Sequence, residues 1–197
     1  MKRTLFGIAV LCLSVAALPA TAGSKPQIED VLGDANFVND QGTGDGTFGD
    51  FNQADAGTVS DLTGVTFTND AKNLYVTIAT EASPPAATGI GYRVRVNPDG
   101  TGGAYCIFFE AFFPGANNVL TAGKAQVRDD CTGETTEVQV LGTQIVVPRN
   151  LNKAFGKGAK LTAPQAQSFL YSGDYPTGTA GPFADTTKVG TDFTFKR

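Results

Sequence analysis

The feature that most constrains the fold is a recurring period-two alternation of apolar and polar residues in the first half of the chain. Residues 62–69 and 73–80 both alternate in this way, and the turn Asn69-Asp70-Ala71-Lys72 separates them. A period of two places apolar side chains on one face of a β-strand. The two segments therefore predict a β-hairpin, and the recurrence of the pattern predicts an all-β fold.

A second hairpin is predicted from residues 91–97 and 104–113, which a Pro- and Gly-rich turn joins. Apolar residues alternate with two arginines in the first of these segments, whereas the second is apolar on both faces. Pairing residue 97 with residue 104 brings the two apolar faces together. We expect a core face with the contacts Tyr92–Phe109, Val94–Ile107 and Val96–Tyr105.

The opposite face of this hairpin is both charged and aromatic. It carries Cys106 and the candidate ligand-binding residues Arg93, Arg95, Phe108, Glu110 and Phe112. One hypothesis is a binding surface, because Arg and Glu bind hydroxyls or carboxylates and Phe rings offer stacking area. The alternative is a second core layer, in which Arg93 and Glu110 form a diagonal cross-strand ion pair.

The remaining segments complete a single domain of the sandwich or barrel type. Weaker strands are predicted at 125–128, 136–140 and 143–147, a helical turn at 150–155, closing strands at 167–171 and 191–195, and a surface loop at 175–190. The chain shows no long helical pattern and no repeat. We expect one all-β domain over residues 23–197.

The N-terminus has the pattern of a secretory signal peptide over residues 1–22. Lys2 and Arg3 precede an apolar segment, and Ala20-Thr21-Ala22 provides a cleavage site. A lipoprotein anchor at Cys12 is disfavoured because Leu11 is bulky. Cleavage changes the net charge from −4 to −6, which disfavours binding to nucleic acid or an anionic membrane. We expect a secreted protein that does not insert into the membrane.

Cysteine and histidine counts narrow the chemistry. Once Cys12 leaves with the signal peptide, Cys106 and Cys131 remain, and in an oxidising compartment they should form a disulfide. A two-thiol metal site lacks further ligands, since the chain has no His. The absence of His also excludes a Ser-His-Asp triad and His-ligated zinc or haem.

An acidic, Gly-rich stretch lies between Lys25 and Lys72. It holds nine Asp or Glu residues and no Lys or Arg. Carboxylates at this density repel one another, and bound Ca²⁺, which takes six to eight oxygen ligands, would offset that repulsion. The alternative is a solvated loop that keeps the protein soluble.

Short motifs resemble a known family. The Asp30-Val31-Leu32-Gly33-Asp34 opening, Ser60-Asp61-Leu62 before the first hairpin, and Asn73-Leu74-Tyr75-Val76 within it are similar to DOMON-like domains of the family-9 carbohydrate-binding-module-like type. The resemblance implies an antiparallel jelly-roll-like β-sandwich, a non-catalytic role and a structural Ca²⁺ site. The implied metal ligands are Asp30, Asp34, Asn36 and Asp61.

The chain departs from that family in its ligand chemistry. It has no Trp to grip a sugar ring, and its only Met is the initiator, so haem binding is not expected. We therefore expect a secreted, non-catalytic module that binds a glycan or cell-envelope polymer. The alternative is a cell-surface structural or protein-interaction domain without a small ligand. A glycoside hydrolase that uses Glu110 as its acid is more remote, because the sequence identifies no second carboxylate.

Overall fold

The computed structural model describes residues 25–31, 60–82, 89–99, 105–113, 123–172 and 179–196. The expected signal peptide and the expected metal ligands Asp34 and Asn36 lie outside these residues. Within the described ranges, no helix has the length and hydrophobicity that a membrane crossing requires.

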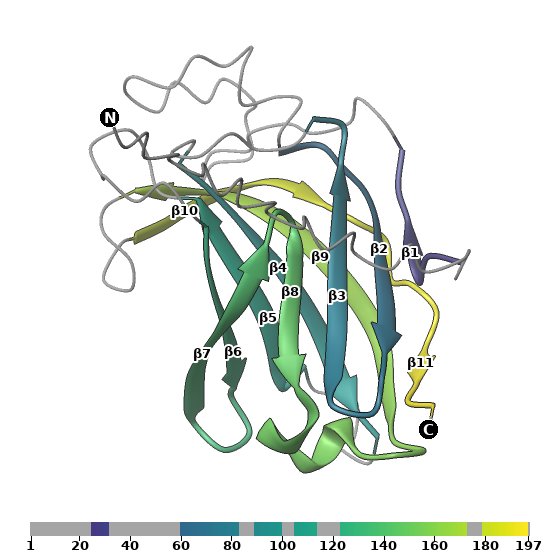
Figure 1. Ribbon diagram of the computed structural model, residues 1–197. Helices are drawn as coiled ribbons and strands as arrows, with labels where there is room; N and C mark the ends of the chain where they lie inside the picture. Colours follow the sequence, from purple (N-terminus) through teal and green to yellow (C-terminus); the bar gives the residue numbers. More distant parts are fainter. Residues whose placement is uncertain are drawn as a thin grey trace, which may run out of the picture.

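The described part of the chain is built almost entirely from antiparallel strands (Figure 1). The strands are β1 (Ile28–Glu29), β2 (Leu62–Asn69), β3 (Asn73–Thr80), β4 (Ile90–Pro98), β5 (Ile107–Phe113), β6 (Lys124–Asp129), β7 (Glu134–Leu141), β8 (Gln144–Pro148), β9 (Lys160–Ser172), β10 (Thr179–Thr186) and β11 (Phe193–Thr194). Two 3-10 helices, η1 (Arg149–Leu151) and η2 (Lys153–Phe155), lie between β8 and β9. The predicted all-β class is confirmed.

In the described residues the strands form one continuous sheet with the order β1-β2-β3-β8-β7-β6-β5-β4-β9-β10, and β11 also pairs with β9. The sheet curls, so that β2 and β3 lie in front of β4, β5 and β9 in Figure 1. Contacts between the two ends hold the curl. The Leu62 amide donates to the Asp185 carboxylate (2.8 Å), the Ser168 hydroxyl donates to the Ser60 carbonyl (2.6 Å), and the Thr191 amide donates to the Gln27 carbonyl (2.8 Å).

The core lies inside the curl and is rich in phenylalanine. The Phe67 ring lies 6.0 Å from Phe109 and 5.6 Å from Phe193, and Phe155 lies 5.9 Å from both Phe109 and Phe195. These rings join β2, β5, η2 and the C-terminal segment into one cluster. Burying each such side chain contributes about 1.5–3 kcal/mol before the cost of ordering. The cluster is therefore a main source of the stability that holds the two layers of the curled sheet together.

Both predicted hairpins are present, but the register of the second differs from the prediction. Tyr92 pairs with Ala111, Val94 with Phe109 and Val96 with Ile107, a shift of two residues. A shift of two leaves every side chain on its predicted face. The arginine-bearing face therefore survives the correction, and Arg93 stands directly opposite Glu110 rather than on a diagonal.

The start of β5 also departs from the prediction. Cys106 is buried in the core cluster, whereas it was expected on the arginine face. Tyr105 is only half-buried and stacks against the Arg95 guanidinium instead of Val96. The regular alternation begins only at Ile107, because the two preceding residues lie outside β5.

The C-terminal third holds more strand than its composition suggests. The segment predicted as a loop at 175–190 contains β10, and the strand predicted at 167–171 is the end of the 13-residue β9. The pairing of β10 with β9 shifts register twice, between Ala180 and Phe183 and between Phe183 and Asp185. An edge position and such irregularities are where a strand tolerates Pro and Gly, so the turn-like composition misled the prediction.

Candidate functional site

The outer face of β10, β9, β4, β5, β6 and β7 carries three parallel rows of residues that run across the strands. The arginine row comprises Gln165, Arg95, Phe108, Arg128 and Thr135. The central row comprises Gln167, Arg93, Glu110, Gln126 and Glu137. The aromatic row comprises Phe183, Phe169, Gly91, Phe112 and Lys124. All five candidate ligand residues from the sequence lie in these rows.

The central row is organised around a buried carboxylate. Glu110 is 2% exposed, and its Oε1 accepts a hydrogen bond from Arg93 Nε at 2.7 Å and lies 3.5 Å from Arg128 Nη2. Its Oε2 accepts from Gln126 Nε2 at 2.7 Å. Two guanidiniums and an amide therefore surround this side chain, and Glu110 is the acceptor that these three groups share. The predicted Arg93–Glu110 ion pair is confirmed.

In the arginine row each aromatic ring is next to a cation. The Arg128 guanidinium lies 4.2 Å from the Phe108 ring centroid, and the Arg93 guanidinium lies 5.6 Å from the same ring. Arg95 lies 4.3 Å from the Tyr105 ring and donates from Nε and Nη2 to Gln165 Oε1. Cation–π contacts of this kind contribute about 0.5–2 kcal/mol each, depending on exposure. The rings therefore support the guanidiniums and fix their planes.

The aromatic row is closed by packing around a glycine. Gly91 lies between Phe169 and Phe112, and a Cβ at Gly91 would lie 2.3 Å from the Phe169 ring. That ring occupies the space above the glycine and meets Phe112 edge-on at 6.1 Å. Both rings are buried, at 0% and 6% exposure. This part of the face is therefore a second layer of the core, as the alternative expectation held.

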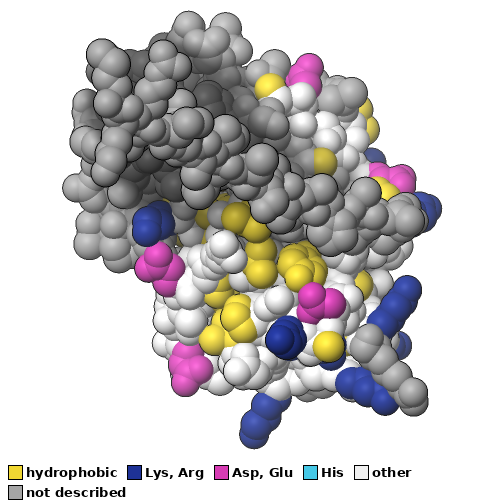
Figure 2. Space-filling view, viewed as in Figure 1, with side chains coloured by type: hydrophobic (Ala, Val, Ile, Leu, Met, Phe, Trp, Pro, Cys, Tyr) yellow, Lys and Arg dark blue, Asp and Glu magenta, His cyan; other side chains and the backbone are white. Residues whose placement is uncertain are grey.

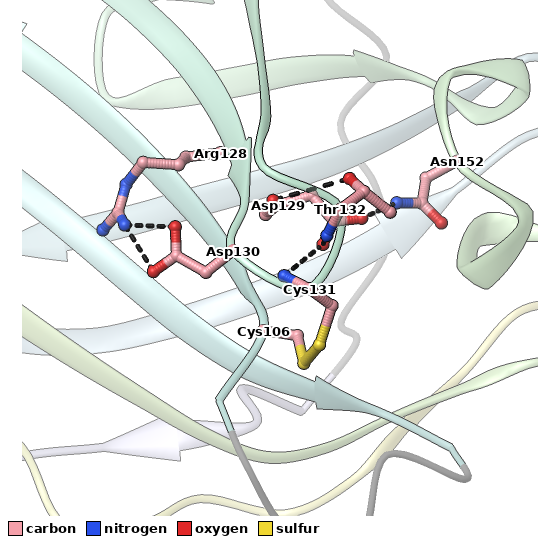
Figure 3. The surroundings of a disulfide bond; sticks show 7 residues. All are labelled: Cys106, Arg128, Asp129, Asp130, Cys131, Thr132 and Asn152. Carbon is pink, nitrogen blue, oxygen red and sulfur yellow. Dashed lines mark hydrogen bonds and ion pairs between the residues drawn. A yellow bond between two sulfur atoms is a disulfide. The ribbon is translucent and has the colours of Figure 1, made fainter.

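One end of the arginine row is fixed by the turn between β6 and β7 (Figure 3). Arg128 Nη1 donates to both carboxylate oxygens of Asp130, and the predicted disulfide joins Cys131 to Cys106 with a Cα–Cα distance of 5.2 Å. Burial lowers the pKa of Arg128, but the Glu110 and Asp130 carboxylates outweigh burial and raise that pKa above its ordinary value. Arg128 is therefore a permanent cation in this face.

The neighbouring carboxylate in the same turn has a structural task. Asp129 Oδ1 accepts from the amides of Cys131 and Thr132 at 3.0 and 3.2 Å, and its Oδ2 accepts from the Asn152 side chain at 2.6 Å. Asn152 in turn accepts from the Ala154 amide at the start of η2. Figure 3 shows Asp129 and Asp130 pointing to opposite sides of the strand. The turn that presents Asp130 is thus tied to the 3-10 segment.

The predicted ligand residues fall into two groups, those that are partly exposed to solvent and those that are buried. Arg95 and Phe108 are half-buried, and the Arg93 and Arg128 side chains are 21% and 29% exposed. Phe112 and Glu110 are buried, so they have no surface to offer directly. The arginine row is the part of the face that remains accessible.

Sequence reasoning missed several members of the site. Gln126, Arg128, Gln165 and Phe169 come from β6 and β9, whose neighbours in the sheet could not be assigned from one sequence. The alternation Lys-Ala-Gln-Val-Arg at 124–128 did place Gln126 and Arg128 on one face. Only the pairing of β6 with β5 shows that this face adjoins Glu110.

Two of the four expected metal ligands can be located. Asp30 directly follows β1, and its amide donates to the Thr63 carbonyl in β2 at 3.2 Å. Asp61, 1% exposed, directly precedes β2. The N-terminal segment therefore does lie along the start of the first hairpin. Among the described residues, no group of three or more Asp, Glu, His or Cys side chains is arranged to hold a metal ion.

Comparison of the chain with models of protein families, with curated proteins and with solved structures gave no match.

Proposed function

We propose that this protein is a secreted, non-catalytic binding module whose ligand is a glycan or cell-envelope polymer, and that the arginine row is the contact surface. The observation that carries the proposal is the placement of Arg95 and Arg128 on either side of Phe108 on an accessible sheet face, with Tyr105 stacked against Arg95. Amide and guanidinium donors suit ligands rich in oxygen acceptors. A row that spans five strands suits an extended ligand.

The role of Glu110 supports a binding function over catalysis. Both carboxylate oxygens are engaged with Arg93, Arg128 and Gln126. A general acid in glycoside hydrolysis must hold a proton and reach the glycosidic oxygen. Glu110 instead serves to place two arginines at fixed positions in the face.

The direct test is retention of the purified protein by polysaccharides in a glycan array and a pull-down. Arg95→Ala should weaken retention at a stability cost of about 0.5–2 kcal/mol, because Arg95 contacts Tyr105 and Gln165 outside the core cluster. Lys157→Ala removes an exposed positive charge outside the three rows and is the matched control. The proposal fails if no polysaccharide is retained, or if the two variants behave alike.

The second part of the proposal is a structural calcium ion bound by Asp30, Asp34, Asn36 and Asp61. The support is the position of Asp30 beside β2 and of Asp61 at the first residue before it. Such an ion would stabilise the fold by about 2.7 kcal/mol at a hundredfold excess over Kd. Thermal unfolding in EDTA and in millimolar Ca²⁺ should differ, and superimposable curves would remove calcium from the proposal.

An alternative function is a cell-surface protein-interaction domain without a small ligand. The observation in its favour is Phe183, which is 41% exposed on edge strand β10 and lies 6.2 Å from Phe169. An exposed ring beside an arginine is common at protein interfaces. Loss of partner capture with Phe183→Ala, while polysaccharides are not retained, would favour this alternative.

A further inference from the structure

We propose that the ligand of the arginine row is an anionic polysaccharide, and that Arg95 binds its acidic groups. The inference rests on the proposed function and narrows it from glycans in general to those that carry carboxylate or sulfate groups along the chain. Three features of the face support it: the state of its rings, its charge, and the way Arg95 is held.

The first feature is that the aromatic rings in and beside the arginine row already contact guanidinium groups. Phe183 in the aromatic row is 41% exposed, but its ring also lies 6.0 Å from the Arg93 guanidinium. Neutral sugars dock their apolar ring faces on bare aromatic surfaces. Here the Phe108 ring lies between Arg93 and Arg128, and Tyr105 lies against Arg95. Phe169 and Phe112 are buried. The arginine row therefore offers guanidinium groups more than stacking platforms, which favours an anionic partner.

The second feature is the local charge. The three rows and Asp130 bring together four cations, Arg93, Arg95, Arg128 and Lys124, and three carboxylates, Glu110, Asp130 and Glu137. All the carboxylates are paired to cations other than Arg95. Arg95 has no carboxylate partner among the described residues. The face thus has one surplus positive charge on a chain of net charge −4.

That surplus is useful only at short range. The Debye length is about 10 Å at 0.1 M salt, so distant acidic residues are screened while a contact pair is not. Arg95 can therefore attract an oxyanion that touches it although the protein as a whole is acidic. Binding should weaken as salt rises, as for other exposed charge pairs.

The third feature is that Arg95 is held in place before any ligand arrives. Its guanidinium stacks on Tyr105 and donates to Gln165, and Gln165 in turn donates to the Thr187 carbonyl at 2.7 Å. A side chain fixed in this way loses less conformational freedom on binding. The planar fork of Arg also matches a carboxylate or sulfate group in two-point contact, which Lys cannot reproduce.

The row also indicates a polymer. Arg95 and Arg128 stand in one row two strands apart, which corresponds to about 10 Å at the usual strand spacing of 4.7–4.9 Å. A ligand that follows the row passes from one guanidinium to the next across Phe108. Because Arg128 is already paired with Glu110 and Asp130, the acidic groups of the ligand bind at Arg95, and the rest of the row serves as an extended contact for the polymer.

The test compares three purified polymers by affinity electrophoresis at about 0.1 M salt. Polygalacturonate carries carboxylates, dextran sulfate carries sulfates, and dextran is neutral. We expect at least one polyanion to bind more tightly than dextran. Arg95→Gln should weaken that binding roughly tenfold, which equals about 1.4 kcal/mol. Arg95→Lys should recover only part of it, and Lys157→Ala should leave it unchanged.

The outcomes separate this inference from the proposed function. Equal binding of dextran and the polyanions would overturn the anionic ligand and leave the glycan-binding module in place. Binding to none of the polymers would count against both. A loss of equal size in Arg95→Gln and Lys157→Ala would show attraction by net charge alone and would overturn the role of Arg95. Urea denaturation of each variant shows whether a loss of binding comes from a loss of fold.

Discussion

The two halves of the curled sheet have similar inner faces and different outer faces. β2, β3 and β8 contain no charged residue, and their outer side chains include Thr66, Thr68, Tyr75, Thr77, Gln144 and Val146. Figure 2 views the molecule from this side and shows mostly uncharged side chains over β3 and β8. In the other half, β4, β5 and β6 carry three arginines, two of which contact the buried Glu110.

The ion cluster around Glu110 is a feature that this fold does not require. The neutral half shows that this sheet can be built with polar, uncharged outer side chains. Burying Glu110 with two guanidiniums incurs desolvation that apolar residues would avoid. An ion cluster therefore adds little to stability compared with apolar residues. Its presence in one half is consistent with the binding surface proposed above. Substitutions in each half, compared by their effect on the free energy of unfolding, test this interpretation.

The largest effect is expected from the disulfide, which lies in the charged half. Replacing Cys106 and Cys131 by Ser should lower the free energy of unfolding by about 3–4 kcal/mol, because the bridge closes a loop of 25 residues. Urea denaturation of the oxidised protein and the double variant measures the difference. Coincident midpoints would show that the bridge does not contribute to the free energy of unfolding.

The next largest effect should come from the buried glutamate. Glu110→Ala leaves Arg93 and Arg128 without their shared carboxylate and should cost about 2–3 kcal/mol, below the fully buried range because both arginines keep some exposure. The matched change in the neutral half is Thr77→Val, which removes one hydrogen bond from Gln144 and should cost about 0.5–1 kcal/mol. Equal losses in the two variants would remove the contrast between the halves.

A third prediction concerns packing over Gly91. Gly91→Ala should lower stability by about 1–3 kcal/mol, because the new methyl group meets the Phe169 ring at 2.3 Å. Phe169→Leu also destabilises, but in the double variant the two losses should not add, since the smaller side chain makes room. Additive losses measured by thermal unfolding would mean that the ring and the glycine do not depend on each other.

The smallest effect lies in the neutral half, at the turn between β2 and β3. Asp70 accepts hydrogen bonds from the amides of Asn73 and Lys72, both at 2.7 Å, and from the Tyr75 hydroxyl at 2.8 Å. These bonds, chiefly that from Asn73, lower the pKa of Asp70, and the bond to Asp70 raises the pKa of Tyr75.

Because the folded pKa is depressed, the stability from Asp70 is present above its unfolded value of 3.8 and is lost as pH falls through the folded pKa. Because Asp70 is exposed to solvent, its contribution to the free energy of unfolding is about 1 kcal/mol. The unfolding midpoint of the wild type should thus fall toward that of Asp70→Asn in this acid range. A constant gap between the two proteins below pH 3.8 would contradict the assignment.

The parts of this fold that one sequence could predict are those set by local alternation. The hairpins of β2–β3 and β4–β5 followed from period-two patterns, and the arginine face survived a register error of two residues because two is the period of the strand. The Cys106–Cys131 pair followed from counting cysteines. These features depend on neighbours in the sequence or on very few candidates.

The parts that could not be predicted depend on which strands become neighbours. Gln165 and Phe169 reach the site only because β9 pairs with β4, about 70 residues earlier in the chain. The Gly and Pro residues of β10 have the composition of a turn and therefore predict a loop. An edge strand accepts these residues, which is why the prediction was wrong. Long-range pairing of this kind leaves no local pattern.

The contact between Gly91 and Phe169 has a consequence for how this protein can vary. The two positions share one volume, so a side chain at 91 requires a smaller one at 169. Neither position can change freely while the other stays fixed, although 77 residues lie between them in the chain. Relatives of this protein should therefore show these two sites changing together, and a pair that co-varies in size would reveal the β4–β9 neighbourhood from sequences alone.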